Sequence, residues 1–255
     1  MSLTETDMRR HLDWQGCLNA RDLGGLRLSN GAQTSWRAVV RSDNLSQLTD
    51  AGCQALRAHG IGTIVDLRHD SEREANPPRL IDGVETIPIP LEDLSDIEFW
   101  QKWGGLICTP LYYKAFLERF PGRVASVLSA IAAAGPGGVL FHCGIGRDRT
   151  GLIALLMLAL AGVEHEQIAS DYELSEHRLC RDVEQNKINE LLARENTTIR
   201  QSILDLLACI DVEAYMRTAG LSADEINLLR NKLTFPGGAD ILPAAGAGGP
   251  PAPPD

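Results

Sequence analysis

The stretch that decides the fold is residues 138–151, GVLFHCGIGRDRTG. Residues 138–142 are mostly apolar and predict a short buried strand. Gly144 and Gly146 then favour a turn, and Thr150 and Gly151 open the apolar segment 152–163, which predicts a buried helix. A strand, a glycine-containing turn and a helix in this order bring the turn's backbone N–H groups and the helix N-terminus to one place.

Such a turn is suited to holding a phosphate group. The backbone N–H groups of residues 144–149 can surround one anion, and the helix N-terminus adds about half a positive charge. Arg149 can hold two phosphate oxygens with its planar guanidinium. Thiols in such fields titrate at roughly 3.5–7.5 instead of ~8.5, so Cys143 is predicted to be a nucleophilic thiolate. The alternative interpretation is an inert thiol at a strand end.

The segments around this stretch predict further strands and helices in alternation. Residues 38–41, 62–67 and 86–90 have strand character, and Pro88 and Pro90 place the last of these at a sheet edge. A helix is expected from Ser46 or Thr49 to Ala58. This alternation predicts an α/β fold with a mostly parallel sheet, whose ligands bind beyond the carboxyl ends of the strands. Three polar segments follow such ends, at 41–43, at 66–68 and from Cys143 onward.

Composition narrows the functional classes. The 255 residues carry 24 Lys and Arg against 34 Asp and Glu, a net charge of −10, which argues against a broad nucleic-acid-binding surface. None of the six Cys residues forms a CxxC pair, so no metal or other cofactor is expected. Segment 152–163 is shorter than the ~20 residues of a membrane span. Residues 1–14 do not resemble a signal peptide, so a cytoplasmic location is expected, with export lacking a cleavable signal left open.

Residues 142–151 resemble the His-Cys-x5-Arg-Ser/Thr loop of the cysteine-dependent protein tyrosine phosphatase superfamily. The closer similarity is to its bacterial tyrosine and lipid phosphatases, which carry an HCxxGKDRTG loop. Further matching blocks are NARDLGG at 19–25, RSD at 41–43, VDLR at 65–68 and DYELS at 171–175, so the resemblance spans roughly 14–232. It implies a three-layer fold with a central sheet of about four to five strands. We therefore expect a phosphatase domain over 1–235 and a disordered tail over 236–255.

The resemblance also implies roles for individual residues. Cys143 is the nucleophile that forms a cysteinyl-phosphate, and Arg149 binds phosphate and stabilises the transition state. The remaining expected phosphate contacts are backbone N–H groups of Gly144, Ile145, Gly146 and Arg147. Supporting positions are His142, which braces the loop, and Thr150, which can hydrogen-bond the thiolate. Asp66, Arg21 and Asp22 either support the loop or form ordinary ion pairs.

The general acid is harder to assign. The bacterial subfamily carries an Asp immediately before the loop Arg, which corresponds to Asp148. Its neighbours Arg147 and Arg149 predict a lowered pKa for this carboxyl, which would favour an acidic pH optimum. Asp93 and Asp96 are the alternatives.

Two departures from the family pattern leave substrate preference open. Arg147 stands where the subfamily usually has Lys, and Ile145 stands where it usually has a small residue. The leading interpretation is a phosphomonoesterase acting on phosphotyrosine in proteins, with inorganic phosphate as product. Dual-specificity or phosphoinositide phosphatase activity is the first alternative. A sulfurtransferase or arsenate reductase and a non-catalytic phosphate-binding module are the others. Whether another Cys protects Cys143 from oxidation stays open.

Overall fold

A computed structural model describes residues 4–179 and 182–235. Its centre is a five-stranded sheet with the order β1-β2-β5-β3-β4, in which only β1 runs antiparallel to its neighbour. The strands are β1 (Arg21–Asp22), β2 (Val39–Ser42), β3 (Ile61–Asp66), β4 (Glu85–Pro88) and β5 (Gly138–His142). The predicted α/β fold with a mostly parallel sheet is confirmed, and β4 lies at the edge as its prolines predict. The expected tail 236–255 lies outside the described residues.

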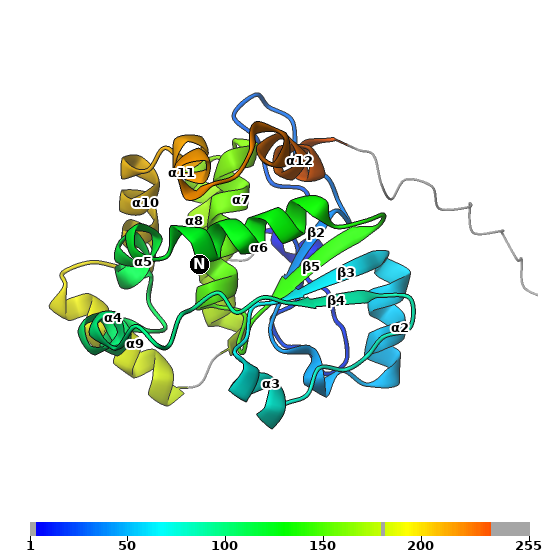
Figure 1. Cartoon of the computed structure of the whole chain (residues 1–255), viewed down its shortest axis with the longest axis horizontal. Helices are drawn as coiled ribbons and strands as arrows, with labels where there is room; N and C mark the ends of the chain where they lie inside the picture. Colours follow the sequence, from blue (N-terminus) through cyan, green and yellow to red (C-terminus); the bar gives the residue numbers. More distant parts are fainter. Residues whose placement is uncertain (1–3, 180–181, 236–255) are drawn as a thin grey trace, which may run out of the picture.

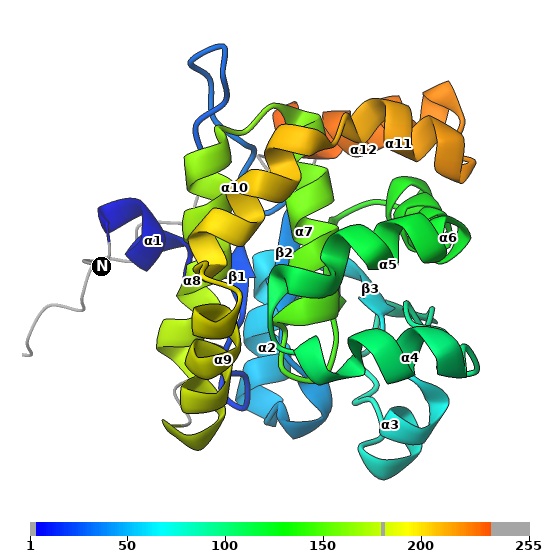
Figure 2. The same cartoon turned by 90° about the vertical axis from the view of Figure 1, so that its left-hand side faces the viewer.

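Helices surround the sheet (Figures 1 and 2). In chain order they are α1 (Glu5–Arg10), α2 (Asp50–His59), α3 (Asp70–Ala75), α4 (Ile97–Trp103), α5 (Tyr113–Arg119), α6 (Pro121–Ala133), α7 (Asp148–Ala161), α8 (His165–Leu179), α9 (Asp182–Arg194), α10 (Ile199–Cys209), α11 (Val212–Ala219) and α12 (Ala223–Thr234). Short 3₁₀ turns lie at Leu45–Gln47, Gly104–Leu106 and Pro110–Tyr112.

Alternate strand residues face two separate cores, which gives the three layers. Val40, Ile64 and Leu140 are buried in a smaller core that includes Leu56 of α2. Their strand neighbours, such as Val65 and Phe141, belong instead to a larger core built with α6 and α7. Because successive side chains of a strand point to opposite faces, each strand contributes to both cores.

Local sequence explains where α2 begins and ends. The Thr49 side chain accepts a hydrogen bond from the Gly52 N–H, which caps the first turn. Gly60 ends the helix in the left-handed region, with φ +94°. The expected helix after Thr49 is therefore confirmed, one residue longer than predicted.

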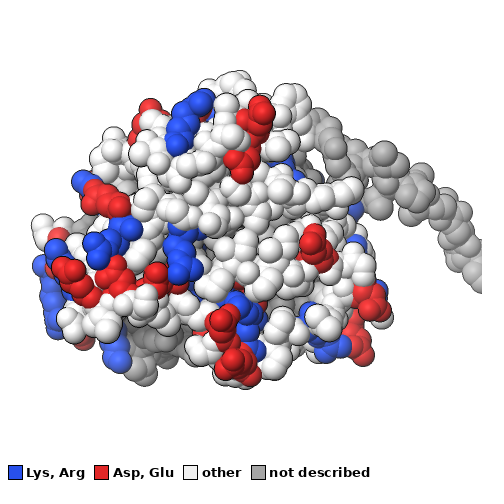
Figure 3. All heavy atoms as spheres, viewed as in Figure 1, with Lys and Arg blue, Asp and Glu red and all other residues white. Residues whose placement is uncertain are grey.

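Helix α7 is the buried central helix, as the apolar segment 152–163 predicts. Nearly all its side chains are buried, and it ends at Gly162. Among the described residues, no helix is both long and apolar enough to cross a membrane. On the face shown in Figure 3, acidic and basic side chains lie together in small groups separated by uncharged areas. The expected cytoplasmic location stays a prediction.

The sheet order fixes where a ligand can bind. Strand β5 lies between β2 and β3, and all three run parallel. The residues at their carboxyl ends lie side by side, since Ser42 and Asp66 each pair with His142. The segment after β5 therefore lies at the centre of the edge where the sequence predicts a site.

Candidate active site

The loop between β5 and α7 curls around the thiol of Cys143. Cys143 is 2% exposed, and its Sγ accepts a hydrogen bond from the Gly146 N–H at 3.3 Å. Gly146 has φ +71°, and a Cβ there would lie 2.6 Å from the Ser42 carbonyl oxygen. Only glycine fits this close approach to the end of β2. The Asn44 N–H also binds the Gly144 carbonyl, at 2.9 Å.

Two side chains from the N-terminal part of the chain hold the loop by donating to its backbone carbonyls. The Asn19 amide donates to the carbonyls of Ile145 and Gly146 at 3.1 and 3.2 Å. Arg41 donates to the Gly146 carbonyl at 2.8 Å. The C=O and N–H of one peptide point in opposite directions. Holding the Ile145 carbonyl therefore turns the Gly146 N–H toward Cys143.

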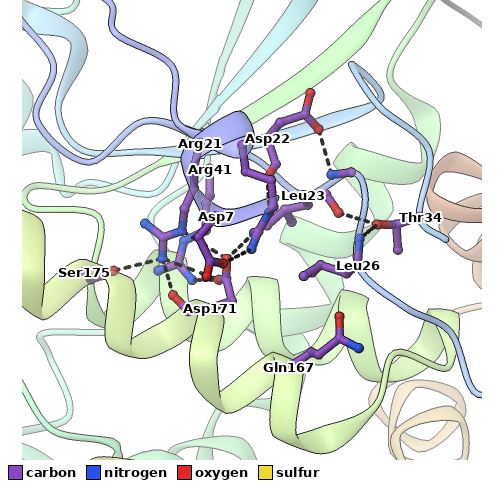
Figure 4. A network of polar contacts seen from close by, with 12 residues as sticks. Asp7, Arg21, Asp22, Leu23, Leu26, Thr34, Arg41, Gln167, Asp171 and Ser175 are labelled. Atoms are coloured by element: carbon purple, nitrogen blue, oxygen red, sulfur yellow. Dashed lines mark hydrogen bonds and ion pairs between the residues drawn. The ribbon is translucent and has the colours of Figure 1, made fainter. Parts of the chain in front are cut away.

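A buried carboxylate anchors this support (Figure 4). Asp171 of α8 pairs with Arg21 at 3.0 Å, with Arg41 at 2.7 Å and also with Arg10. Burial alone would raise the pKa of Asp171, but the charges of the three arginines hold it well below its usual range. Asp171 is therefore an anion that fixes the arginine contacting the loop.

Arg21 and Asp22 separate into different roles. Arg21 reaches the loop through Asn19, whose Oδ1 accepts from Arg21 Nη1 at 2.6 Å. Asp22 accepts from the backbone N–H groups of Gly24 and Arg37 at 2.8 Å and contacts His59 at 3.0 Å. Asp22 thus orders the segment between β1 and β2. Of the two roles expected for Asp22, loop support or an ordinary ion pair, these contacts favour the second.

His142 braces the loop through its own ring. Its Nδ1 lies 3.1 Å from the Cys143 carbonyl and its Nε2 lies 3.7 Å from Asp66 Oδ1. Burial lowers the pKa of His142 despite the Asp66 charge. Asp66 is itself held by Arg68, with Nη2–Oδ2 at 2.7 Å. Burial opposes ionisation of Asp66, but its hydrogen bonds to Arg68 and the His142 charge lower its pKa.

Arg149 extends from the first turn of α7 and meets two carboxylates. Glu72 of α3 binds its two terminal nitrogens at 2.5 and 2.8 Å, and Glu92 lies 3.5 Å from its Nε. Burial would lower the pKa of Arg149, but Glu72, the Cys143 charge and Glu92 raise it. The same pair lowers the pKa of Glu72 to about 2 against the effect of burial. Sequence analysis missed Glu72, because nothing in its neighbourhood distinguishes it from a surface Glu.

Asp148 is the first residue of α7, and its carboxyl is buried. Its Oδ2 accepts from the Cys108 N–H at 2.8 Å, and its Oδ1 accepts from the Tyr172 hydroxyl at 3.2 Å. Burial raises the pKa of Asp148 to about 6, although the Cys108 N–H and Arg147 lower it. The predicted lowering of this pKa is therefore wrong, because desolvation outweighs the neighbouring arginine. A carboxyl of this kind can donate a proton near neutral pH.

The alternative acids sit in a different environment. Asp93 binds Ser95 and Arg123, and these hydrogen bonds lower its pKa to about 2. Asp96 caps α4 and pairs with Arg119, which lowers its pKa as well. The lowered pKa values of both groups favour the carboxylate form, whereas the raised pKa of Asp148 favours a proton donor.

The remaining loop residues differ in burial. The Arg147 side chain is buried, and its Nε and Nη1 have no hydrogen-bond partner among the described residues. The buried Thr150 hydroxyl has none either. Ile145 is half-buried, so it is not a core residue under the loop. The described residues contain no group of three or more His, Cys, Asp or Glu placed to hold a metal ion.

Comparison with models of known protein families gives a match over most of the chain. The tyrosine phosphatase family matches residues 12–235. The chain belongs to the tyrosine phosphatase family. The matched range includes the Cys143 loop and the blocks at 19–25, 41–43 and 171–175.

Individual relatives of this phosphatase family cover different shares of the chain. A "Tyrosine-protein phosphatase" of Nostoc commune is 36% identical over 146 residues, 56% of this chain, and the chain spans about half of its length, 49%. The "Triple specificity protein phosphatase PtpB" of Mycobacterium tuberculosis is 26% identical over 250 residues, covering 76% of this chain and 90% of that protein. The crystal structure of P. aeruginosa TpbA with pTyr is 16% identical with a TM-score of 0.40, covering 72% of this chain and 86% of that one.

Proposed function

We propose that the protein hydrolyses phosphomonoesters through a cysteinyl-phosphate intermediate on Cys143. The observation that carries this proposal is the backbone loop directed at one thiol. The Cys143 Sγ receives the Gly146 N–H at the N-terminus of α7, and Arg149 stands in the first turn of that helix. A preorganised set of donors is the main means of stabilising the charge of a phosphoryl-transfer transition state.

In the first step, the Cys143 thiolate attacks phosphorus. The new S–P bond forms while the ester P–O bond breaks. The loop N–H groups and Arg149 take up the charge on the phosphoryl oxygens. The protonated Asp148 carboxyl donates its proton to the leaving oxygen, so the alcohol or phenol departs neutral.

In the second step, water attacks phosphorus and the P–S bond breaks. The Asp148 carboxylate, formed in the first step, accepts the water proton. Inorganic phosphate leaves, and the thiolate is regenerated. The Thr150 hydroxyl, which is buried and has no hydrogen-bond partner among the described residues, is proposed to donate to that thiolate as it leaves.

Phosphotyrosine in proteins is the proposed principal substrate. The family membership and the names of two relatives, a tyrosine-protein phosphatase and a triple-specificity phosphatase, support this class. Phosphoserine and phosphothreonine are included as lesser substrates of the same loop.

Phosphoinositides are the second candidate substrate class. The observation that favours them is the buried Arg147 guanidinium, whose Nε and Nη1 have no partner in the described chain. A second phosphate on the substrate would satisfy such donors once the buried Arg147 side chain turns out toward the substrate.

The test is phosphate release from a matched panel, with Cys143→Ser as the blank. The panel contains phosphotyrosine, phosphoserine and phosphothreonine peptides and short-chain phosphoinositides. Release that depends on Cys143 supports the proposal, and release that survives Cys143→Ser refutes the covalent mechanism. Thiocyanate and arsenite assays on the same preparation test the sulfurtransferase and arsenate reductase alternatives. Faster release from phosphoinositides than from phosphotyrosine would reverse the order of substrates.

A further inference from the structure

Two tyrosine hydroxyls from different helices contact Asp148, one at its carboxyl and one at its backbone carbonyl. Tyr172 of α8 contacts Oδ1 at 3.2 Å, and Tyr113 of α5 lies 3.2 Å from the Tyr172 hydroxyl. Tyr113 also donates to the backbone carbonyl of Asp148 at 2.8 Å. Both tyrosines are fully buried, and their rings meet edge to face with centroids 6.1 Å apart. The three residues form one buried hydrogen-bonded chain.

The start of α7 is shaped to admit these rings. A Cβ on Gly151 would lie 2.6 Å from Cε2 of Tyr172 and 3.2 Å from the Tyr113 hydroxyl. A side chain at 151 would therefore push Tyr172 away from Asp148. The last glycine of the loop motif and the tyrosine of the 171–175 block thus fit each other across 21 positions of sequence.

The two donors to the Asp148 carboxyl differ in what they can do. The Cys108 N–H only donates, so it favours the charged carboxylate. A tyrosine hydroxyl both donates and accepts. Tyr172 can therefore donate to the carboxylate, or accept from the protonated acid while donating to Tyr113. In the second arrangement the Tyr113 hydroxyl accepts from Tyr172 and still donates to the backbone carbonyl of Asp148.

We propose that Tyr172 is a positioning residue of the reaction, whose hydroxyl holds the Asp148 carboxyl in both halves of the catalytic cycle. This inference rests on the proposed function, in which Asp148 is acid in the first step and base in the second. A buried carboxyl that loses its partner in either state is destabilised in that state and is free to rotate. Tyr172 prevents both.

Groups other than Tyr172 also interact with Asp148 and affect its charge state. They come from four segments of the chain and are Tyr112, Tyr113, Glu92, Arg147 and the Cys108 N–H. Burial raises the pKa of Asp148, whereas the hydrogen bond from Tyr172 lowers it. Removing that hydrogen bond while leaving the burial therefore keeps the acid protonated to higher pH.

The test compares Tyr172→Phe with Tyr113→Phe, two buried substitutions that each remove one oxygen atom. We measure kcat against pH with a phosphotyrosine peptide and with an aryl phosphate whose phenol is strongly acidic. For Tyr172→Phe we expect the maximal kcat on the peptide to fall about tenfold and its alkaline limb to move up by about half to one pH unit. The acidic-phenol ester, which needs little proton donation, should change less than about twofold. Tyr113→Phe keeps the Oδ1 contact but removes the acceptor that Tyr172 uses when the acid is protonated, so its alkaline limb should not move up.

Three outcomes separate this inference from the proposed function. An unmoved alkaline limb in Tyr172→Phe, or equal losses on both substrates, overturns the role of Tyr172 while Cys143-dependent activity stands. No leaving-group selectivity in Asp148→Asn overturns the acid assignment and this inference together. Absence of any Cys143-dependent phosphate release overturns both the function and the inference.

A second probe covers the case in which Tyr172→Phe does not fold. Incorporating 3-fluorotyrosine at position 172 keeps the ring and makes the hydroxyl a stronger donor. The carboxylate is then favoured further, so the alkaline limb should move down, opposite to the Phe variant. An unchanged limb in the folded fluorinated protein overturns the proposal.

Discussion

Replacing Asp171 by Asn tests the buried support of the loop most directly. Asp171 is 1% exposed, and its two oxygens contact Arg10, Arg21 and Arg41. Asparagine keeps the shape but removes the negative charge. It also turns an N–H donor toward at least one arginine. Arg21 and Arg41 then lose the carboxylate with which they pair among the described residues, while Arg10 keeps Asp7 at 3.8 Å.

The size of the effect follows from this geometry. Breaking a buried ion pair by removing one partner costs about 3–5 kcal/mol, because the remaining charge stays buried. In a chain of this size, each kcal/mol corresponds to about 2–4 °C in melting temperature. We therefore expect Asp171→Asn to lower the melting temperature by about 6–20 °C. Phosphatase activity should fall as well, because Arg41 links Asp171 to the Gly146 carbonyl.

Calorimetry at pH 7 measures this, with Asp82→Asn, an exposed Asp, as the matched control. The low pKa of Asp171 gives the sign with pH. Its contribution is present above the ordinary Asp pKa and is lost as pH falls through the lower folded value. The difference between wild type and Asp171→Asn should therefore shrink in acid. A loss below about 3 °C at pH 7 would show that the three arginines do not depend on this carboxylate.

Three more predictions follow from the loop and its partners. With the pKa of Asp148 raised to about 6, kcat on a phosphotyrosine peptide should fall about tenfold per pH unit above about 7, and Asp148→Asn should abolish this limb in a pH-rate profile. Glu72→Ala should lower kcat/KM about tenfold, because the Arg149 guanidinium loses the carboxylate that positions it. The control is Asp70→Ala, an exposed residue of the same helix, which should leave kcat/KM unchanged. Equal kcat/KM values for the two variants would contradict the positioning of Arg149 by Glu72. Gly146→Ala should reduce both the melting temperature and turnover, because its Cβ meets the Ser42 backbone; a fully active, equally stable variant would refute this loop geometry.

The sequence predicts the part of the site that is local. Residues 138–151 contain the strand, the turn, the proposed nucleophile and the helix start in one continuous stretch, so their relation needs no tertiary information. The 171–175 block is visible only through a family resemblance. Its partners Arg10, Arg21 and Arg41 come from three elements that only the folded chain brings together.

The error over Asp148 shows where sequence reasoning fails. Along the chain its neighbours are Arg147 and Arg149, and both predict a lowered pKa. In the folded protein, Tyr113 and Tyr172 and the turn at Cys108 bury the carboxyl. Desolvation then outweighs the charge of Arg147. Burial depends on segments 24 to 40 residues away, which the local sequence does not show.

Helix α8 connects the two chemical functions of the site. Adjacent residues on a helix point about 100° apart, so Asp171 and Tyr172 face different surroundings. Asp171 pairs with Arg41, which contacts the Cys143 loop, and Tyr172 contacts Asp148, the proposed acid at the start of α7. A movement of α8 would therefore misplace the anion loop and the proton donor together. Substitutions that loosen α8 should slow substrates with good and poor leaving groups alike, whereas loss of the Tyr172 hydroxyl alone should slow only the latter.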